Sequence, residues 1–541
     1  MCTKYRKQVL AGEITELCKQ YINEIADEYD FDVMEMEVMP DHIHLLVNTK
    51  PNAAVKLVST YNIHLVGLNR HVEDTLRQYR AAVDFLITVI VDEWNDAFTN
   101  CNTANDAVRV VEALCLQTHK RPTTPYNFSA KFGHFPSYLR RAAIAQAYGM
   151  VKSYQSNLKN WYNQPKSTRG KRPQRPVAGY SCPSMYKDNM YQPVDEKTAR
   201  IKLFTNGNWN WVTVNLKHTD VAYIQRHCVN RTQLSPTLVK KGKRFALAFP
   251  FEENIKLTDT PVEEQLAVAV DLGVNNACTC TVMDSNGNIL TRKFLKTDKE
   301  QREMERILKH IGKVQRSGWH KTPLLWARVR NINRHIAEKT ALFIQDLMIE
   351  YSAHVVVFEH LDIRGKKHGG KKQRLHHWRA DYVQKLVEHK AHRLGGRIAH
   401  VCARGTSSLA FDGSGYVKRG RQSERCKGDY SMCEFSSGKV YNCDLNASYN
   451  IGARYFIREI LRSETVRSRS ELEAKVPQVM KRSTCTLCSL YDLRAAMGVV
   501  QQPCAERVMS EGTKESDAPQ GQPRYGMISI RGNRKHVTSV M

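Results

Sequence analysis

The spacing of apolar and polar positions divides the first half of the chain into three kinds of segment. Residues 1–56 predict a small α/β unit, with a helix over 14–29 and strands over 33–38 and 42–47. A strand is predicted over 57–68, followed by helices up to residue 162, the longest over 72–95 and 136–162. Residues 177–260 alternate like strands, and Asn206-Gly207 has the composition of a two-residue hairpin turn.

A different alternation begins at residue 264. Short apolar runs predict strands over 266–270, 278–283, 289–294, 354–358 and 397–402. Helical spacing predicts helices over 299–316, 325–351 and 376–395, and another that begins near Asp444. The polar residues after 499 are typical of a disordered tail. The pattern therefore predicts a multi-domain α/β protein.

Composition narrows the class of protein. The 541 residues correspond to about three or four domains. The apolar content of 42% and the 46 aromatic residues (23 Tyr, 16 Phe, 7 Trp) exclude a fully disordered chain. The most apolar run covers residues 85–91 and is far shorter than the roughly 20 residues of a membrane-spanning helix. The net charge of +27 favours a polyanionic partner, with nucleic acid as the first candidate.

The first residues and the cysteines bear on location. The opening segment contains no apolar stretch of the kind found in secretory signals, so we expect a cytoplasmic, nucleoid-associated protein of prokaryotic type. The 15 cysteines are odd in number and scattered, which is typical of reduced, buried or metal-bound thiols.

Three acidic residues occur at the ends of apolar segments: Asp271, Glu359 and Asp444. An ionised carboxylate at the end of a buried strand is costly unless it is paired or bound to a metal. Three carboxylates from separate segments can converge on one point, and such oxygen ligands suit Mg²⁺. Two ions so held can activate water and stabilise the leaving oxygen of a phosphodiester. Each residue alone could equally be a strand-end or turn residue, but the set of three favours a metal site.

The sequence motifs around these residues resemble those of a known family. Asp271-Leu-Gly-Val-Asn-Asn, Glu359-His-Leu-Asp and Cys443-Asp444-Leu-Asn-Ala-Ser-Tyr-Asn-Ile look like the three motifs of a split RuvC nuclease domain. With Arg404-Gly-Thr-Ser, they resemble the TnpB family, the transposon-encoded relatives of type V CRISPR effectors. The resemblance covers about residues 57–490. It implies an RNase H-like nuclease domain, a helical recognition domain and a β-barrel wedge domain.

The resemblance also implies an activity and partners. It implies an RNA-guided DNA endonuclease that binds a guide RNA, cuts target double-stranded DNA next to a short protein-read motif, and uses Mg²⁺ held by Asp271, Glu359 and Asp444. No membrane and no protein oligomer are required. Two alternatives stay open, namely a nuclease-inactive RNA-guided DNA-binding repressor and a transposase that acts through the N-terminal histidines.

Basic residues predict the nucleic-acid contacts. Seven Lys or Arg lie between positions 364 and 379, just after Glu359, where a phosphate backbone would have to enter. An isolated charge run is more often a solvated surface, but this location favours nucleic-acid binding. The residues predicted to contact nucleic acid are Arg140, Arg141, Lys366, Lys367, Lys371, Lys372 and Arg374.

The sequence departs from the TnpB pattern where the family carries a zinc ribbon. Relatives have two Cys-x-x-Cys pairs between the Thr-Ser word and the last aspartate, whereas Cys426, Cys433 and Cys443 lack that spacing. Cys485 and Cys488 form a single pair beyond Asp444. A closed zinc site needs four ligands, so we expect no bound zinc.

The N-terminal segment resembles a second family. Met39-Pro-Asp-His42-Ile-His44 places two histidines on one face of a strand, and this segment resembles the HUH transposase TnpA, the usual neighbour of TnpB. That family uses a tyrosine followed four residues later by a glutamine, and no such pair occurs in the first 130 residues. We therefore expect a fused remnant without activity.

These observations predict six regions. They are a truncated HUH-like fragment (1–56), a first wedge strand (57–68), a helical recognition domain (69–162), a β-barrel wedge domain (163–262), a split RuvC domain (263–498) with a degenerate zinc-ribbon region (404–443), and a disordered tail (499–541).

Overall fold

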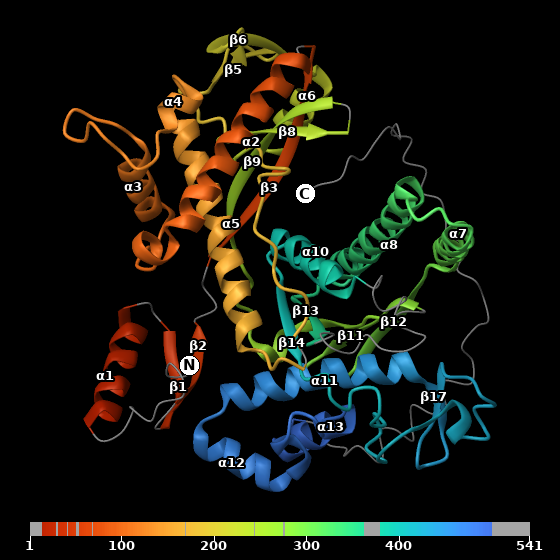
Figure 1. The fold of residues 1–541 in the computed structure, drawn as a ribbon. Coiled ribbons are helices and arrows are strands. Elements are labelled where there is room, and N and C mark those ends of the chain that lie inside the picture. Colours follow the sequence, from red (N-terminus) through yellow and green to blue (C-terminus); the bar gives the residue numbers. More distant parts are fainter. Residues whose placement is uncertain are drawn as a thin grey trace. The chain divides into compact units, whose positions relative to one another are not determined.

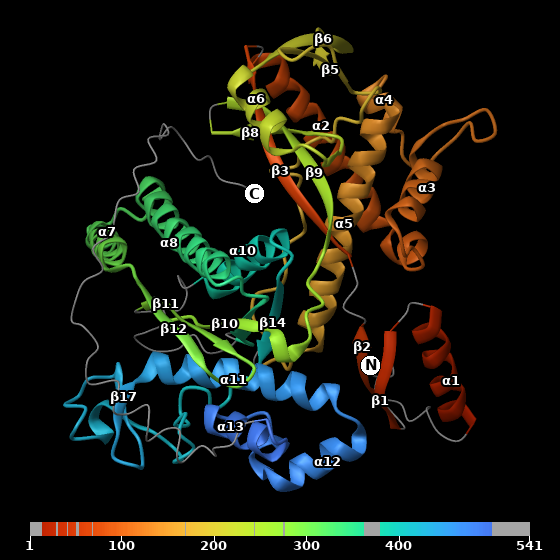
Figure 2. The same cartoon turned by 180° about the vertical axis from the view of Figure 1, so that it is seen from behind.

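The computed structural model describes residues 13–28, 31–39, 42–49, 54–67, 69–167, 169–242, 244–273, 276–361 and 379–499. The described residues divide into two compact units, one formed by residues 58–253 and the other by residues 13–57 together with residues 254–499. Figures 1 and 2 show the elements from opposite sides. The predicted basic loop at 364–378 and the predicted tail from 500 lie outside the described residues.

The N-terminal segment forms the predicted helix and hairpin. Helix α1 (Glu13–Glu28) is followed by strands β1 (Phe31–Met39) and β2 (His42–Thr49). The two strands pair in antiparallel fashion, with Met39 opposite His42 next to the turn. His42 and His44 are therefore two positions apart on one strand, as the sequence predicted.

Helices form the first half of the unit at 58–253. They are α2 (Asn69–Asp92), α3 (Ala104–Cys115), α4 (Phe128–Phe132) and α5 (Ser137–Asn163). The long helices α2 and α5 match the two that the spacing predicted, and each buries an apolar stripe in a shared core. On α5 this stripe is made of Leu139, Ala142, Ala143, Ile144, Ala147, Tyr148 and Val151.

The same unit contains a sheet of seven strands that is open. Its order is β4-β5-β6-β3-β9-β7, with β8 paired to β9. The strands are β3 (Ala54–Val66), β4 (Tyr191–Pro193), β5 (Thr198–Thr205), β6 (Asn208–Leu216), β7 (Thr232–Gln233), β8 (Thr237–Lys241) and β9 (Arg244–Lys256), with α6 (His218–His227) between β6 and β7. The expected closed barrel is wrong, because closure requires the two outermost strands to pair and β4 and β7 lie at opposite ends of the order.

The predicted hairpin of this sheet is confirmed. Strands β5 and β6 pair from Thr198 to Asn215 around Asn206-Gly207. Both turn residues have positive φ, 52° for Asn206 and 81° for Gly207, as the type I′ turn that favours Asn-Gly requires.

The second unit is built on a five-stranded mixed sheet with the order β12-β11-β10-β13-β14. The strands are β10 (Leu266–Asp271), β11 (Asn276–Asp284), β12 (Ile289–Lys296), β13 (Val355–Glu359) and β14 (Arg397–Val401). β10, β11 and β12 form an antiparallel meander, whereas β10, β13 and β14 run parallel. All five strands occur where the sequence predicted them.

Helices cover both faces of this sheet. Val268, Val270 and Phe358 point to the face covered by α8 (Pro323–Glu350) and α10 (Ala380–Arg393). Ala267 and Ala269 alternate with them and pack on the opposite face against α11 (Cys443–Ser463). Figure 1 shows α11 running along that side of the sheet.

Helix α11 comes unusually close to the sheet at Gly452. A Cβ atom built on Gly452 would lie 2.4 Å from Sδ of Met283 and 3.1 Å from Cβ of Ala269. The end of the Met283 side chain is flexible and could move, whereas the contact with Ala269 would have to give by a few tenths of an ångström. The glycine therefore allows the helix to lie close to the strand.

The remaining elements of this unit extend from the sheet. Helix α7 (Asp298–Arg316) and α8 form a helical hairpin with a small core of its own around Ile307, Ile311 and Val329. The predicted irregular stretch contains a three-stranded sheet of β15 (Lys418–Arg419), β16 (Met432–Glu434) and β17 (Val440–Asn442). After α11 follow α12 (Val466–Lys475) and α13 (Leu487–Ala496), which the spacing did not predict.

Candidate active site

Two of the three predicted carboxylates occupy matching positions on neighbouring strands. β10 and β13 are parallel, with Val270 opposite Phe358 at the last pair before Asp271 and Glu359. Asp271 and Glu359 therefore end adjacent strands at the same edge of the sheet. The carboxyl edge of parallel strands is where α/β proteins commonly place their functional side chains.

The third carboxylate reaches this edge from α11. Strand alternation puts Asp271 on the same face as Ala269, and Glu359 on the same face as Val357, which is the face covered by α11. Asp444 is in the first turn of that helix, whose N-cap residue Asn442 accepts hydrogen bonds from the backbone N–H groups of Asp444 and Leu445. The fold thus brings the three predicted residues together.

The electrostatics of Asp271 reflect this convergence. Burial raises the pKa of the Asp271 carboxyl well above its usual range, and the negative charges of Glu359 and Asp444 raise it further. The guanidinium of Arg419 acts in the opposite direction. Burial also raises the pKa of Glu359, a shift that its hydrogen bond with Thr406 and the charge of Arg454 partly offset. Like charges that interact so directly need a cation to be stable in their ionised form.

Neighbouring polar side chains orient two of the carboxylates. Thr406 Oγ1 donates a hydrogen bond to Glu359 Oε1. Asn276 Nδ2 donates a hydrogen bond of 2.7 Å to Asp444 Oδ2. In both cases the other carboxylate oxygen has no hydrogen bond within the described part of the chain, so each group is fixed in place while one oxygen remains available.

A row of polar residues on α11 holds the loop that carries Thr406. Asn446, Asn450 and Arg454 are spaced by four residues and so lie along one face of the helix; we call them the polar ladder. All three side chains are buried. Asn446 and Asn450 lie within the third sequence motif, whereas Arg454 lies beyond it and was not predicted to have a role. The four-residue spacing of polar side chains in an otherwise apolar helix was the available sign.

The ladder binds backbone atoms of residues 402–411. Asn446 accepts from the N–H of Phe411 at 2.8 Å and donates to the carbonyl of Leu409 at 2.9 Å. Asn450 donates to the carbonyls of Thr406 and Leu409, both at 2.9 Å, and accepts from the N–H of Leu487 at 3.2 Å. The helix that begins with Asp444 is therefore tied directly to the loop that orients Glu359.

Arg454 completes the ladder at its far end. Its guanidinium donates to four carbonyls, those of Cys402 (2.6 Å), Arg404 (2.8 Å), Ser483 (3.0 Å) and Cys485 (2.9 Å). Burial lowers its pKa, but a guanidinium remains charged in proteins. The four carbonyls replace the water that this charge loses on burial.

A second arginine that the sequence did not indicate lies beside Asp271. Arg419 belongs to β15, and its guanidinium donates a hydrogen bond to the carbonyl of Ser407. Its charge lowers the pKa of Asp271, which places the guanidinium near this carboxylate. No spacing argument leads to Arg419, because it comes from the irregular stretch between the second and third motifs.

The donor chemistry of the three carboxylates fits a hard divalent cation. Carboxylate oxygens are the protein ligands that Mg²⁺ prefers. Glu359 and Asp444 each accept a hydrogen bond from a neutral side chain, Thr406 and Asn276, which does not neutralise their charge. As placed, no group of three or more His, Cys, Asp or Glu side chains in the described ranges is arranged to hold one ion. The fit therefore rests on the oxygen ligands and their mutual repulsion.

The cysteines of the expected degenerate zinc ribbon lie around the three-stranded sheet. A hydrogen bond between the Cys433 and Cys443 thiols raises the pKa of Cys433 and lowers that of Cys443. Cys426 adds a further, weaker interaction with Cys433. Cys485 points elsewhere, toward the carbonyl of Lys481 at 3.4 Å. We predict that no zinc binds at these cysteines, because a fourth ligand is missing.

The predicted nucleic-acid contacts are only partly within the described residues. Arg140 and Arg141 both approach Glu112 of α3, at 3.5 and 3.2 Å, so one carboxylate shares the two charges. Arg141 is the more exposed of the two. The other predicted residues, Lys366, Lys367, Lys371, Lys372 and Arg374, lie outside the described residues.

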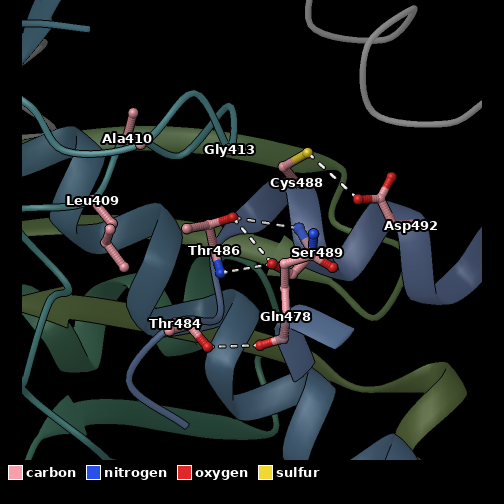
Figure 3. A pocket seen from close by; sticks show the side chains of 10 residues that line it. Leu409, Ala410, Gly413, Gln478, Thr484, Thr486, Cys488, Ser489 and Asp492 are labelled. Atoms are coloured by element: carbon pink, nitrogen blue, oxygen red, sulfur yellow. Dashed lines mark hydrogen bonds between the residues drawn. The ribbon is translucent and has the colours of Figure 1, made fainter. Parts of the chain in front are cut away.

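A pocket of about 110 Å³ lies elsewhere in this unit and contains none of the three carboxylates. Figure 3 shows Leu409 and Gly413 on one side and residues of α13 on the other. The hydroxyls of Thr486 and Ser489 cap α13 with a reciprocal pair of hydrogen bonds, and Thr484 donates to the carbonyl of Gln478. These polar groups serve the helix end, so the pocket gives no reason to place the chemistry there.

Two segments of the chain match models of transposase families. The "Transposase IS200 like" family model matches residues 1–79, and the "Probable transposase" model OrfB_IS605 matches residues 249–369, which include Asp271 and Glu359. The predicted resemblance is confirmed. A third model, the Aq_aa04 family, matches residues 59–205.

Individual relatives agree with these matches. The chain is 46% identical over 54 residues to the ISDra2 transposase TnpA of Deinococcus radiodurans, which covers 10% of this chain and 39% of that protein. It is 25% identical over 242 residues to the TnpB-like protein aq_aa05 of Aquifex aeolicus, which covers 40% of this chain and 76% of that protein. The chain thus spans about two fifths of the first of these relatives.

A solved structure is similar in part. The Cas12f1–sgRNA–target DNA complex contains a chain that is 14% identical, with a TM-score of 0.48, over 70% of this chain and 82% of that one. Among the residues that the structure describes here, no helix is both long and apolar enough to cross a membrane.

Proposed function

We propose that this protein is an RNA-guided DNA endonuclease that hydrolyses phosphodiester bonds with two Mg²⁺ ions held by Asp271, Glu359 and Asp444. The observation that carries the proposal is the convergence of these three carboxylates, from two parallel strand ends and a helix start, on one face of the sheet. The match of residues 249–369 to a transposase family and the similarity to a TnpB-like protein support the same conclusion.

Each side chain has a distinct task in this proposal. Asp271, whose pKa is raised by the charges of both Glu359 and Asp444, would hold Mg²⁺ together with these two residues. Thr406 and Asn276 each fix one oxygen of Glu359 and Asp444, which leaves the other oxygen for metal binding. When bound, the ions would supply an activated water and stabilise the leaving oxygen of the phosphodiester. Arg419 adds a positive charge beside Asp271 that suits an approaching phosphate.

Two observations support a guide RNA and a target DNA as partners, namely the net charge of the chain and its resemblance to the TnpB family. The net charge of +27 suits a protein that binds long polyanions. The resemblance to the TnpB family supplies the guide RNA, the double-stranded target and the short protein-read motif. The N-terminal segment is proposed to be an inactive remnant, because its histidine pair lacks the tyrosine that such transposases use.

Conservative replacement of each carboxylate tests the catalytic proposal. The variants Asp271→Asn, Glu359→Gln and Asp444→Asn keep the size of the side chain but remove the negative charge that holds a cation. Each should reduce guided cleavage by more than about a hundredfold, since the loss of even an outer partner of a metal ligand costs about 10–100-fold. Guided DNA binding, measured separately by gel shift, should stay within a factor of about two because the carboxylates do not hold the guide duplex.

Asp346→Asn is the matched control. It removes one negative charge from an exposed position on α8 in the same unit and should leave cleavage unchanged. Full cleavage by any of the three site variants would remove that residue from the site. RNA-directed binding without cleavage by the parent protein would instead identify the repressor. Covalent protein–DNA adducts that disappear in the His42→Ala, His44→Ala double variant would identify an active transposase domain.

Sequencing the RNA that co-purifies with the parent protein tests the guide. A discrete RNA species that directs cleavage to a complementary target is the expected result. Cleavage that is equally efficient after complete removal of RNA would contradict the proposal.

A further inference from the structure

The hairpin of α7 and α8 carries a concentration of positive charge that the proposed site does not use. We call residues 306–334 the hairpin tip. Between positions 306 and 337 the sequence contains no Asp or Glu. The tip contains eight basic residues, all of them exposed: Arg306, Lys309, Lys313, Arg316, Lys321, Arg328, Arg330 and Arg334.

These charges are largely available for an external partner. Arg328 pairs with Glu303 at 2.5 Å, just outside the tip. None of the other seven forms an ion pair with any residue of the described ranges. A local excess of this kind repels itself and is stabilised by an incoming polyanion.

An exposed tryptophan stands at the turn between the two helices. Trp319 exposes 73% of its surface, although its backbone N–H is fixed by the carbonyl of Val314 at 3.3 Å. Leu324, in the first turn of α8, is 84% exposed. Ile307, Ile311 and Val329 pack between the helices and hold the tip in shape. An exposed indole surrounded by positive charge has both parts of a single-strand binding surface, an aromatic face for a base and cations for the phosphates.

We infer that the hairpin tip binds single-stranded DNA, with Trp319 stacked on an unpaired base and the surrounding cations on the adjacent phosphates. The inference rests on the proposed function for the identity of the strand. The hairpin connects β12 to β13. β12 ends at Lys296, which pairs with Asn276 near the edge of the sheet where Asp271 lies, and β13 ends in Glu359. A nuclease that opens a duplex produces an unpaired DNA strand close to these segments.

Fluorescence anisotropy with labelled oligo(dT) tests the inference on the full chain, stripped of nucleic acid and measured in chelator so that nothing is cut. Trp319→Ala should weaken binding about tenfold, because stacking on one base contributes that much. The triple variant Lys309→Ala, Lys313→Ala, Lys321→Ala should lower the slope of log affinity against log salt by about 2.

An abasic oligonucleotide separates stacking from charge. It presents phosphates without bases, so Trp319→Ala should bind it as well as the parent does, while the lysine variant should bind it more weakly. Leu324→Ala is the control for an exposed apolar side chain, and Arg467→Ala, Arg469→Ala is the control for two exposed arginines that are already paired with Glu471 and Glu473. Both controls should bind oligo(dT) like the parent.

Other outcomes overturn the inference. Equal losses for Trp319→Ala and Leu324→Ala would mean a general apolar contact. Tighter, Trp319-dependent binding of oligo(U) would assign the tip to RNA, and Trp319-dependent binding of phosphatidylglycerol vesicles in place of oligo(dT) would assign it to lipid. Since binding is measured without metal and without a guide, inactive carboxylates would leave these results unchanged.

Discussion

Helices α5 and α11 are both long and both buried on one side, but they bury different chemistry. On α5 the buried positions are apolar, and the hydroxyl of Tyr148 reaches the carbonyl of Cys101 at 2.6 Å. On α11 the buried positions include Asn446, Asn450 and Arg454 in addition to an apolar stripe. The apolar helix is held by area removed from water, whereas α11 is held in addition by directed hydrogen bonds.

The difference has a structural consequence. An apolar stripe tolerates small shifts, because hydrophobic contact has no preferred direction. Hydrogen bonds to specific carbonyls fix both the helix and the loop that it contacts, and that loop carries Thr406. The polar ladder therefore positions the loop of Thr406 and also stabilises the fold. Variants of the ladder and of the carboxylate site can test these two roles.

Arg454→Met should have the largest effect. The variant keeps the apolar stem but leaves four carbonyls without their donor. Buried groups left without a partner cost about 1–3 kcal/mol each, so that even after partial relaxation the loss is about 3–5 kcal/mol. The free energy of unfolding should fall by that amount in urea denaturation, and cleavage should be lost even under conditions where the variant is folded. Leu139→Ala on α5 is the counterpart, with a loss of about 2–5 kcal/mol but unchanged cleavage per folded molecule. Equal cleavage by both folded variants would refute a positioning role for the ladder.

Asn450→Leu should have the second largest effect. The replacement leaves two carbonyls and the N–H of Leu487 without partners, and buried groups of this kind cost about 1–3 kcal/mol each, partly relieved by relaxation. We expect a loss of about 2–4 kcal/mol together with faster hydrogen exchange in residues 406–411. An unchanged exchange rate in this loop would show that Asn450 stabilises the helix alone.

Asp271→Asn should change the pH dependence of stability. The raised pKa means that, between the usual carboxyl range and the raised value, the folded state binds more protons than the unfolded state. Stability of the metal-free parent should therefore fall as pH rises through this window, by up to about 1.4 kcal/mol per pH unit relative to the variant. Adding Mg²⁺ should restore the parent and leave the variant unaffected. Parallel pH profiles for the two proteins in chelator would contradict the account.

Thr406→Val should have the smallest effect on stability, about 1 kcal/mol. The hydroxyl lowers the pKa of Glu359, so its removal should move the acidic limb of the cleavage profile to higher pH. Thr340→Val on α8 removes another buried hydroxyl, one that donates to the carbonyl of Ile336, and should leave the profile in place. A profile that moves equally in both variants would assign the shift to general loosening.

The strands and helices that carry the three carboxylates could be predicted from the sequence for a physical reason. Buried parallel strands are short, continuous apolar runs, and a charged residue at the end of such a run is conspicuous. Asp271 and Glu359 stand at these points, and the structure places them at the ends of adjacent strands. The helix at Asp444 could be predicted from its helical spacing, and the structure shows that Asn442 caps its start.

The residues that orient the carboxylates could not be predicted in this way. Arg419 and Thr406 lie in a stretch whose local pattern is neither helical nor extended, and their contacts depend on how that stretch folds over α11. The closed barrel was wrong for a related reason. Alternation shows that a segment is a strand, but which strands meet at the ends of the sheet is decided by tertiary contacts.

Gly452 affects the distance between α11 and the strands that carry the other carboxylates. It lies eight residues beyond Asp444 on the same helix, a distance of about 12 Å along the axis. The end of the Met283 side chain could move aside for a single added methyl group, but the contact with Cβ of Ala269 would press the helix a few tenths of an ångström away from β10. The distance between Asp444 and the strand that carries Asp271 therefore depends in part on the lack of a side chain two turns further along the helix. Gly452, which has no functional group, would thus limit which substitutions in α11 still allow the three carboxylates to lie together.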